Sequence, residues 1–135
     1  MGSEPQFSAT INSRNGVASI ALRGELDIAT VADLEGHLAP FESNGVSAIM
    51  LDMRDLTFID SVALRSMVRA RERAKTNGQR LILVGARPTA RRLFELTGTE
   101  HLLDDQETVG VLNRFVGSES REAGQSLAAY LNADA

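Results

Sequence analysis

The sequence predicts a single α/β domain with a mixed, mainly parallel sheet, an antiparallel hairpin strand at its N-terminal edge and about four helices. Two observations support this prediction. Short apolar segments alternate with stretches whose apolar residues recur at helical spacing, which is typical of parallel strands joined by helices. The chain has 135 residues, of which 43% are hydrophobic and 24% charged. One hydrophobic core commonly organises a chain of this length and composition.

The first two strands are expected to form a hairpin. Residues 7–12 and 17–22 are short segments rich in apolar and small polar side chains, and residues 13–16 lie between them. This connection ends in Asn15-Gly16, a pair that readily adopts the positive φ angles of tight hairpin turns. Residues 24–27 (Gly-Glu-Leu-Asp) are expected to end the second strand.

Two further strands and three helices follow. Residues 46–53 and 81–84 are nearly continuous apolar runs, as expected of buried strands. Gly45, Asn77-Gly78 and Gly98 are stop signals for the three helices. Apolar residues at helical spacing are expected on the buried faces: Val31, Leu34, Leu38 and Phe41 in the first helix, Leu64, Met67, Ala70 and Ala74 in the second, and Leu93, Phe94 and Leu96 in the third.

The starts of the first and third helices also carry signals. Thr30 or Asp27 is expected to cap the first helix, and Pro88 suits the first turn of the third. Residues 54–61 are expected to connect the strand 46–53 to the second helix, and Leu102-Leu103 to form a short last strand.

The domain boundaries follow from composition. We expect a flexible N-terminus over 1–5, one domain over 6–117 and a C-terminal extension over 118–135, either frayed or a short helix. The fourth helix would end the domain, with apolar residues Val109, Leu112 and Val116.

The residue inventory excludes several kinds of chemistry. The chain has no Cys, no Trp, one Tyr and two His. These counts exclude thiolate nucleophiles and Cys-based metal sites, and they disfavour a His-rich metal site or a stacking platform for nucleic acid. No apolar run reaches the length of a membrane span, and the N-terminus lacks a signal-peptide pattern. We therefore expect a cytoplasmic protein with no cofactor, no metal, and no direct contact with nucleic acid or membrane.

Charge is unevenly distributed along the chain. Residues 1–60 carry a net charge of −6, residues 61–92 of +8 and residues 93–135 of −6. A basic middle in an acidic protein suggests a polarised surface that steers a charged partner, although ordinary solvated helix faces rich in Arg explain it equally well.

No catalytic constellation emerges from the spacing of polar residues. Asp52/Asp55 and Asp104/Asp105 are more often caps and turn formers than an acid–base pair at such short separation. His101 and His37 are each isolated in the sequence. We therefore predict that the protein is not an enzyme; an enzymatic role would require His101 or the Asp pairs to meet in one pocket.

Asp60-Ser61 is the strongest candidate for a functional position, because it lies between an apolar segment and the expected start of the second helix. The free N–H groups and the dipole of a helix start stabilise a nearby anion by about 0.3–1 kcal/mol. A phosphate on Ser61 would meet those groups, with Arg65 one turn further along. The alternative is that Ser61 or Asp60 is merely the N-cap, a role worth about 1 kcal/mol.

Three segments resemble the STAS domain family (sulfate transporter and anti-sigma factor antagonist). Gly24-Glu25-Leu26-Asp27 before a helix resembles the opening of that domain, and residues 51–61 resemble its central signature, a strand and loop that end in Asp-Ser. Residues 87–98 resemble its third-helix motif. The three motifs occur in the right order, and the resemblance extends over about residues 7–116.

The resemblance implies a function. Free-standing members of the family are anti-sigma factor antagonists. The unphosphorylated protein would bind an anti-sigma factor that is also a serine kinase, and so release a sigma factor. That kinase would then phosphorylate the Ser after the Asp, here Ser61, the complex would dissociate, and a phosphatase would reset the cycle.

This chain departs from the family pattern directly after Ser61. The family commonly has a second Ser or Thr and then Gly, where this chain has Val62-Ala63. The change removes one hydroxyl and the backbone freedom of glycine. If Ser61 were never phosphorylated, the protein would act as a constitutive antagonist or a decoy.

The expected partner-binding surface surrounds Ser61. It comprises Asp27, Asp60, Ser61, Val62, Arg65 and Arg69. For the two arginines, an ordinary solvated helix face is an equally good interpretation. The alternative function is a STAS regulatory subunit of an ABC transport or sensory complex, not phosphorylated, which would dock on an ATPase or a scaffold.

Overall fold

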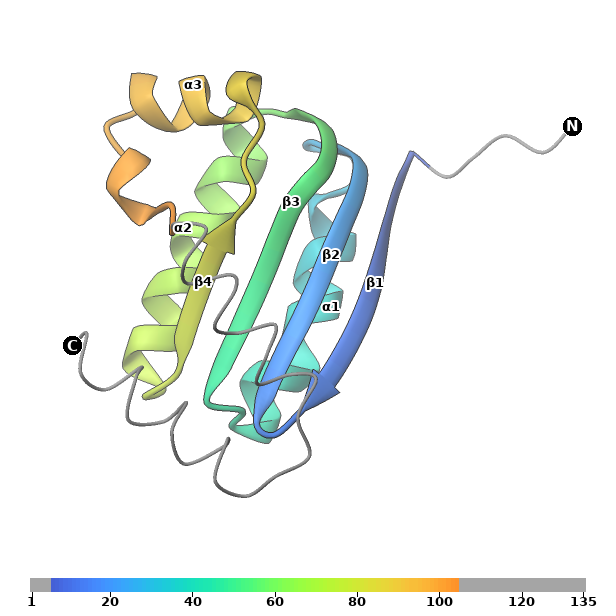
Figure 1. Ribbon diagram of the computed structural model, residues 1–135, viewed down its shortest axis with the longest axis vertical. Helices are drawn as coiled ribbons and strands as arrows, with labels where there is room; N and C mark the ends of the chain where they lie inside the picture. The colour runs from blue at the N-terminus through green and yellow to red at the C-terminus, as the bar shows by residue number, and fades with distance from the viewer. Residues whose placement is uncertain (1–5, 105–135) are drawn as a thin grey trace, which may run out of the picture.

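A computed structural model describes residues 6–104 of the chain. They form a four-stranded sheet with the order β1-β2-β3-β4 (Figure 1). β1 (Phe7–Arg14) pairs antiparallel with β2 (Val17–Leu26), whereas β2, β3 (Ala48–Ile59) and β4 (Arg80–Val84) pair in parallel. The predicted mixed, mainly parallel sheet with an antiparallel edge strand is therefore confirmed.

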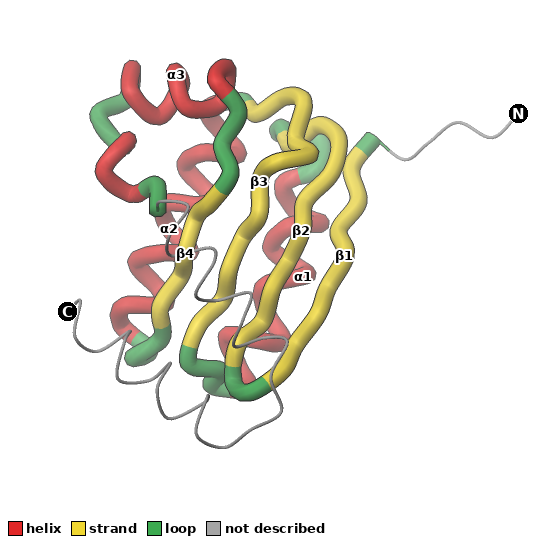
Figure 2. Tube along the Cα trace, in the orientation of Figure 1, coloured by secondary structure: helices red, strands yellow, loops and turns green. Residues whose placement is uncertain are grey.

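Helices cover one face of this sheet. α1 (Val31–Asn44) and α2 (Ser61–Thr76) lie side by side behind the strands, and α3 (Pro88–Leu96) lies beyond the end of β4 (Figures 1 and 2). A 3-10 turn, η1 (Glu100–Leu102), follows α3. The described residues thus contain three α-helices. The predicted fourth helix, the N-terminal segment 1–5 and the extension 118–135 lie outside the described part of the chain.

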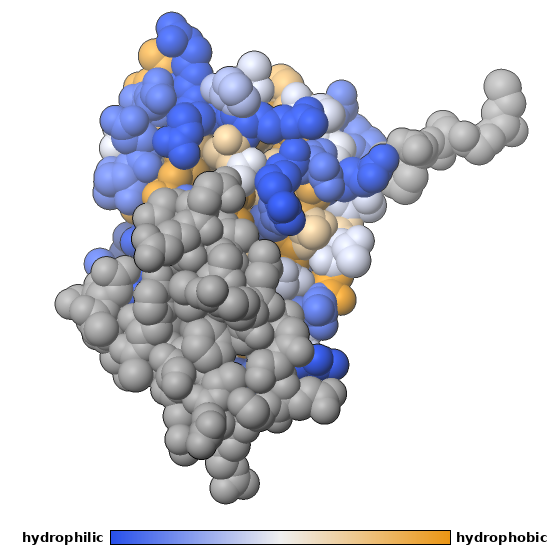
Figure 3. Space-filling model, viewed as in Figure 1, coloured by the Kyte–Doolittle hydropathy of each residue, from blue (hydrophilic) through white to orange (hydrophobic). Residues whose placement is uncertain are grey.

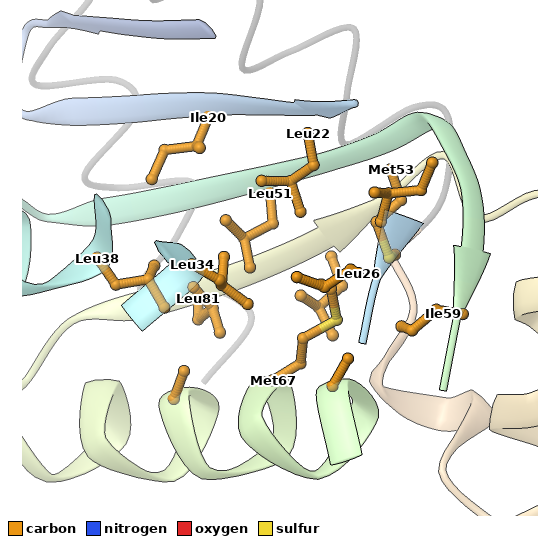
Figure 4. Packing of buried hydrophobic residues seen from close by; sticks show 14 of the residues in the cluster. Ile20, Leu22, Leu26, Leu34, Leu38, Leu51, Met53, Ile59, Met67 and Leu81 are labelled. Carbon is orange, nitrogen blue, oxygen red and sulfur yellow. The ribbon is translucent and has the colours of Figure 1, made fainter. Parts of the chain in front are cut away.

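The core lies between the sheet and the two long helices. Ile20 and Leu51 on the strands point toward Leu34 on α1 and Met67 on α2, and all four side chains are buried (Figure 4). Burying one such side chain stabilises a fold by about 1.5–3 kcal/mol. The predicted stripe of α2, Leu64, Met67, Ala70 and Ala74, is buried as expected.

The hairpin turn is tighter than predicted. β1 continues to Arg14, so the connection consists of Asn15 and Gly16 alone, with φ angles of 55° and 76°. Both residues adopt the left-handed conformation that a two-residue turn between right-twisted strands requires. Of the two caps proposed for α1, Thr30 occupies the N-cap position, but its side chain makes no capping hydrogen bond.

The third strand is longer than predicted. The sequence placed its end at residue 53, whereas β3 continues to Ile59. Its last residues still pair with β2, with Leu56 opposite Gly24 and Ile59 opposite Leu26, and a register irregularity precedes each of these two pairs. This end of the strand is exposed on one face, where the apolar run is interrupted by Arg54, Asp55 and Thr57. The run of buried residues therefore ends before the strand pairing does.

Two smaller predictions near the end of the domain are wrong. Leu96 was placed on the inner face of α3, but it is 70% exposed, and Ala90 and Phe94 form the buried face instead. Leu96 is the last residue of the helix and lies past the edge of the core. Leu102-Leu103 does not form a regular strand, because η1 ends at Leu102 and only Leu103 bridges to Leu83 of β4.

Candidate functional site

The residues singled out by the sequence meet at one end of the sheet. Parallel strands have their carboxyl ends at the same edge, so the segment after β2 and the segment after β3 lie next to each other (Figure 1). Asp27 follows β2 directly, and Asp60 and Ser61 follow β3. A backbone hydrogen bond of 3.2 Å from the Asp60 N–H to the Leu26 carbonyl joins the two segments.

Asp60 holds this end of the molecule together with both carboxylate oxygens. Its Oδ1 accepts the Ala63 N–H at 2.9 Å and so caps α2. Its Oδ2 accepts the Ile28 N–H, at 3.1 Å, from the turn between β2 and α1. One side chain therefore fixes the start of α2 against the neighbouring turn. Asp60, rather than Ser61, is the N-cap.

Ser61 is left free by this arrangement. It is the first residue of α2 and is exposed. Its hydroxyl finds no hydrogen-bond partner among residues 6–104. The helix N-terminus needs no contribution from the serine, because the adjacent carboxylate supplies the cap. The side chain is thus a solvent-facing hydroxyl at the positive end of a helix dipole.

Asp27 organises the turn that precedes α1. Its Oδ1 accepts the backbone N–H groups of Ala29 at 2.9 Å and Thr30 at 3.2 Å. Its Oδ2 accepts Nε2 of Gln6 at 3.1 Å, and the Thr30 hydroxyl donates to the Glu25 carbonyl at 2.9 Å. Because its carboxylate is largely engaged within the molecule, Asp27 shapes the loop beside Ser61.

The two predicted contact arginines lie on the outer face of α2. Arg65 and Arg69 are exposed, and neither forms an ion pair within the part of the chain that the structure describes. Arg73, one turn beyond Arg69, instead turns toward α1. There its Nε donates to Glu42 and its Nη2 donates to Glu35, both at 2.8 Å. The hydrogen bond to Glu42 is the main cause of the raised pKa of Arg73.

The acidic segment 1–60 and the basic segment 61–92 therefore meet where α1 packs against α2, an interface called the seam below. There Arg73 is neutralised by the two glutamates of α1. Arg65 and Arg69, nearer to Ser61, keep a charge without a partner among residues 6–104.

Sequence reasoning did not single out two exposed apolar residues at this end of the sheet. Ile28 is 72% exposed at the turn held by Asp60, and Phe58 is 50% exposed two residues before Asp60. Val62, which the sequence did single out, is 39% exposed. For Ile28 the sequence did contain a signal. This isoleucine directly follows Asp27, in a turn where the core does not require an apolar side chain.

The other candidate polar groups are dispersed over the fold. Asp52 lies on β3, with Nη2 of Arg54 donating to it at 2.6 Å, and Asp55 is exposed. His37 lies on α1, and His101 lies on η1. Within residues 6–104 no three His, Asp or Glu side chains are grouped as a metal site requires. A shallow pocket of about 310 Å³ lies at the C-terminal end of α2, at the opposite end of that helix from Ser61.

The surface and the helices add two observations. Hydrophilic side chains gather over α3 on the face seen in Figure 3. Among the described helices, none combines the length and the apolar character that crossing a bilayer requires.

Comparisons with known proteins concern the family and the fold of this chain. The sequence profile of the STAS domain matches residues 8–111. The anti-sigma-B factor antagonist of Staphylococcus aureus is 31% identical over 88 residues, which are 65% of this chain and 82% of that protein. The sequence similarity therefore extends over most of that relative.

Solved structures show the same fold. The anti-sigma factor antagonist SpoIIAA in its unphosphorylated form has a TM-score of 0.69 at 21% identity, covering 84% of this chain and all of that one. An anti-sigma factor antagonist from Mycobacterium paratuberculosis has a TM-score of 0.66 at 24% identity, covering 75% of this chain and 86% of that one. SpoIIAA has also been solved in its phosphorylated form. On the profile match and the relative together, the chain belongs to the STAS domain family.

Proposed function

We propose that this chain is an anti-sigma factor antagonist that binds an anti-sigma factor with serine kinase activity and is switched off by phosphorylation at Ser61. One observation carries the proposal. In a STAS domain with antagonists among its relatives, the serine after the aspartate is exposed and its hydroxyl is free, because Asp60 alone caps α2. The protein acts in the cytoplasm as a binding protein, and the phosphoryl group is added by its partner.

The replacement of the usual Ser/Thr-Gly by Val62-Ala63 is compatible with this switch. Residue 63 lies inside α2, where the backbone is helical and alanine is a better helix former than glycine. Ala63 is fully buried and donates its N–H to Asp60. The substitution therefore maintains the helix start on which the position of Ser61 depends, and only the second hydroxyl is lost.

The proposed contact surface is the end of the sheet around Ser61. Ser61 and Val62 face outward at the start of α2, and Arg65 and Arg69 continue the same outer face of the helix. Asp27 and Asp60 act mainly by holding the two segments that carry this surface. A phosphoryl group on Ser61 would add about −1.5 to −2 charges that the complex would have to desolvate. A phosphatase would restore the binding form.

The test uses the full chain with purified anti-sigma serine kinases from the organism that carries it. Each kinase is incubated with the chain and Mg-ATP, and the product is analysed by intact mass and peptide mapping. We expect one phosphoryl group, on Ser61, in the wild type and none in Ser61→Ala. Ser43→Ala, which removes another exposed serine on α1, should be phosphorylated like the wild type.

Two outcomes would argue against the proposal in different ways. Binding to a kinase without phosphorylation would remove the switch and leave the antagonist role. Binding to none of the kinases, together with co-purification of a transport ATPase, would replace the proposal with a subunit role in a transport complex.

A further inference from the structure

The face of the sheet that points away from α1 and α2 carries a buried apolar strip. Side chains alternate along a strand, so the residues between those of the core cluster point to this outer face. On β3 and β4 they are Ala48, Met50, Ile82 and Val84, and each is at most 2% exposed. None of the four belongs to the cluster between the sheet and the helices. Met50 lies opposite Ile82, so the four side chains form one continuous surface, called the outer strip below.

The two edges of the sheet differ sharply on this outer face. One row of paired residues crosses all four strands: Asn12 on β1, Ser19 on β2, Met50 on β3 and Ile82 on β4. Asn12 is exposed and Ser19 half-buried, whereas Met50 and Ile82 are buried. An edge strand that is open on one face should be among the most exposed parts of a sheet. The burial of β4 therefore requires a covering element, and no described helix lies on this face (Figure 1).

The described part of the chain ends beside the outer strip. Leu103 bridges to Leu83 of β4, and the Asp104 N–H donates to the Leu83 carbonyl at 2.7 Å. The Leu83 N–H in turn donates to Oδ2 of Asp104 at 3.0 Å. These bonds hold Asp104 about one strand spacing, about 5 Å, from β4. The chain that follows therefore starts at the edge where the buried half of the outer face begins.

We propose that residues 105–117 of the same chain dock on the outer strip and close the second face of the sheet. The first four of these residues are polar and suit a link around the sheet edge. Val109, Leu112 and Val116 follow at helical spacing and supply the apolar side chains that the strip requires. The inference does not depend on the proposed function.

The dimensions and the composition favour this segment over the rest of the C-terminal region. Eight helical residues extend about 12 Å, which is close to the length of about 16 Å of the five residues of β4. Residues 118–126 are mostly polar or small and offer the strip little apolar area. The docked segment would place the end of the domain beyond residue 111, where the match to the family profile stops. It would also make the outer strip unavailable to a partner.

The first experiment detects the contact in the unaltered full chain. Nuclear Overhauser effects are recorded by NMR from the methyl groups of Met50, Ile82 and Val84. We expect cross-peaks to the methyl groups of Val109 and Leu112. A sample that mixes two differently labelled copies of the chain distinguishes contacts within one molecule from contacts between molecules.

Three results of this experiment would overturn the proposal. Cross-peaks from the strip only to residues 123–131 would make the later part of the chain the occupant. Cross-peaks only between differently labelled copies would show that a second molecule covers the strip. No cross-peaks from these methyl groups to any residue after 104 would show that the C-terminal region does not dock there.

The second experiment weakens the docking in the full chain. Leu112→Ser should raise the hydrogen-exchange rates of the β4 amides by about 10-fold or more, because an uncovered edge strand opens more often. The hydrogen-bonded amides of β1, at the other edge, should stay within twofold of the wild type. Leu127→Ser is the matched control, since it removes a leucine beyond the docking segment, and should leave β4 within twofold.

A milder variant separates loss of docking from loss of the fold. If Leu112→Ser unfolds the domain, Val109→Ala takes its place, with an expected increase of about threefold at β4 and none at β1. Circular dichroism checks that each variant retains its secondary structure. Equal exchange at β4 in the folded variant and the wild type would contradict the proposal, as would an equal effect of Leu127→Ser.

Discussion

Two serines on the same helix have opposite environments. Ser61, the first residue of α2, is exposed and its hydroxyl is free among residues 6–104. Ser66 is 7% exposed, and its hydroxyl donates to Glu35 of α1, which also accepts from Arg73. Five residues are about 1.4 helical turns, enough to move a side chain from the outer end of α2 to its contact with α1. The same residue type is available for modification in one place and part of the scaffold in the other.

The contrast shows how the scaffold and the site are connected. The seam between α1 and α2 is closed at one end by Asp60, which bonds to Ile28, and along its length by Glu35, Glu42 and Arg73. The position of the turn beside Ser61 therefore depends on α1 as well as on α2. Four changes, from the largest expected effect to the smallest, test this contrast.

Phosphorylation of Ser61 is expected to have the largest effect. It should weaken the kinase complex by about a hundredfold or more, equivalent to about 2.8 kcal/mol. Isothermal titration calorimetry on the purified phosphorylated and unphosphorylated chains gives both constants. Ser61→Ala should bind like the unphosphorylated wild type, because the free hydroxyl has no partner to lose. Equal affinities for the two forms of the wild type would contradict the account.

Removing the Asp60 side chain is expected to come next. Asp60→Ala loses the cap of α2 and the bond to Ile28, which should destabilise the fold by about 1–2 kcal/mol. Urea unfolding measures this loss. The protection of the Ile28 amide against hydrogen exchange should fall more than that of core strand amides. Asp60→Asn is the control, because asparagine also caps helices and should recover much of the stability. An unchanged exchange rate at the Ile28 amide would show that its hydrogen bond to Asp60 does not stabilise the turn.

Breaking the buried serine contact should have a smaller effect. Ser66→Ala removes one hydrogen bond to a glutamate that is still partly exposed to solvent, and we expect a loss of about 1 kcal/mol. A double-mutant cycle with Glu35→Gln should give a coupling energy above about 0.5 kcal/mol if the two side chains act together. Additive effects in urea unfolding would mean that the contact does not couple the helices. Under the kinase assay, Ser66 should remain unmodified.

Charge reversal on the outer face of α2 is expected to have the smallest effect at equilibrium. Arg65→Glu combined with Arg69→Glu should slow association with the kinase at low salt and leave dissociation nearly unchanged. Stopped-flow or surface-based kinetics at two salt concentrations measures both rates. Lys75→Glu, a reversal at the far end of the same helix, is the matched control. Identical association rates in the double variant and the wild type would assign these arginines to an ordinary solvated surface.

The order and type of elements could be predicted because the signals are local. Asn15-Gly16 requires a tight turn, the glycine after α1 adopts the left-handed conformation, and Leu64, Met67 and Ala70 repeat at helical spacing. The end of β3 could not be predicted in this way. There the strand is exposed on one face, and backbone pairing with β2 maintains it in place of a continuous apolar run.

The candidate site was only partly predictable for a related reason. The position of Asp60-Ser61 at a helix start can be predicted from the sequence. That the cap belongs to Asp60, and that Ile28 lies beside it, depends on the register between β2 and β3. Contacts between residues 32 positions apart leave no periodic trace, so the contact of Ile28 with Asp60 emerges only once the strands are aligned.

The account is tested most directly by reconstituting the competition with a sigma factor. The complex of a sigma factor with its anti-sigma kinase is titrated with this chain, and the released sigma factor is quantified by size-exclusion chromatography. We predict that the unphosphorylated chain and Ser61→Ala release the sigma factor, and that the chain phosphorylated at Ser61 does not. If the unphosphorylated chain binds the kinase without displacing the sigma factor, or if the phosphorylated chain displaces it equally well, the proposed function is wrong.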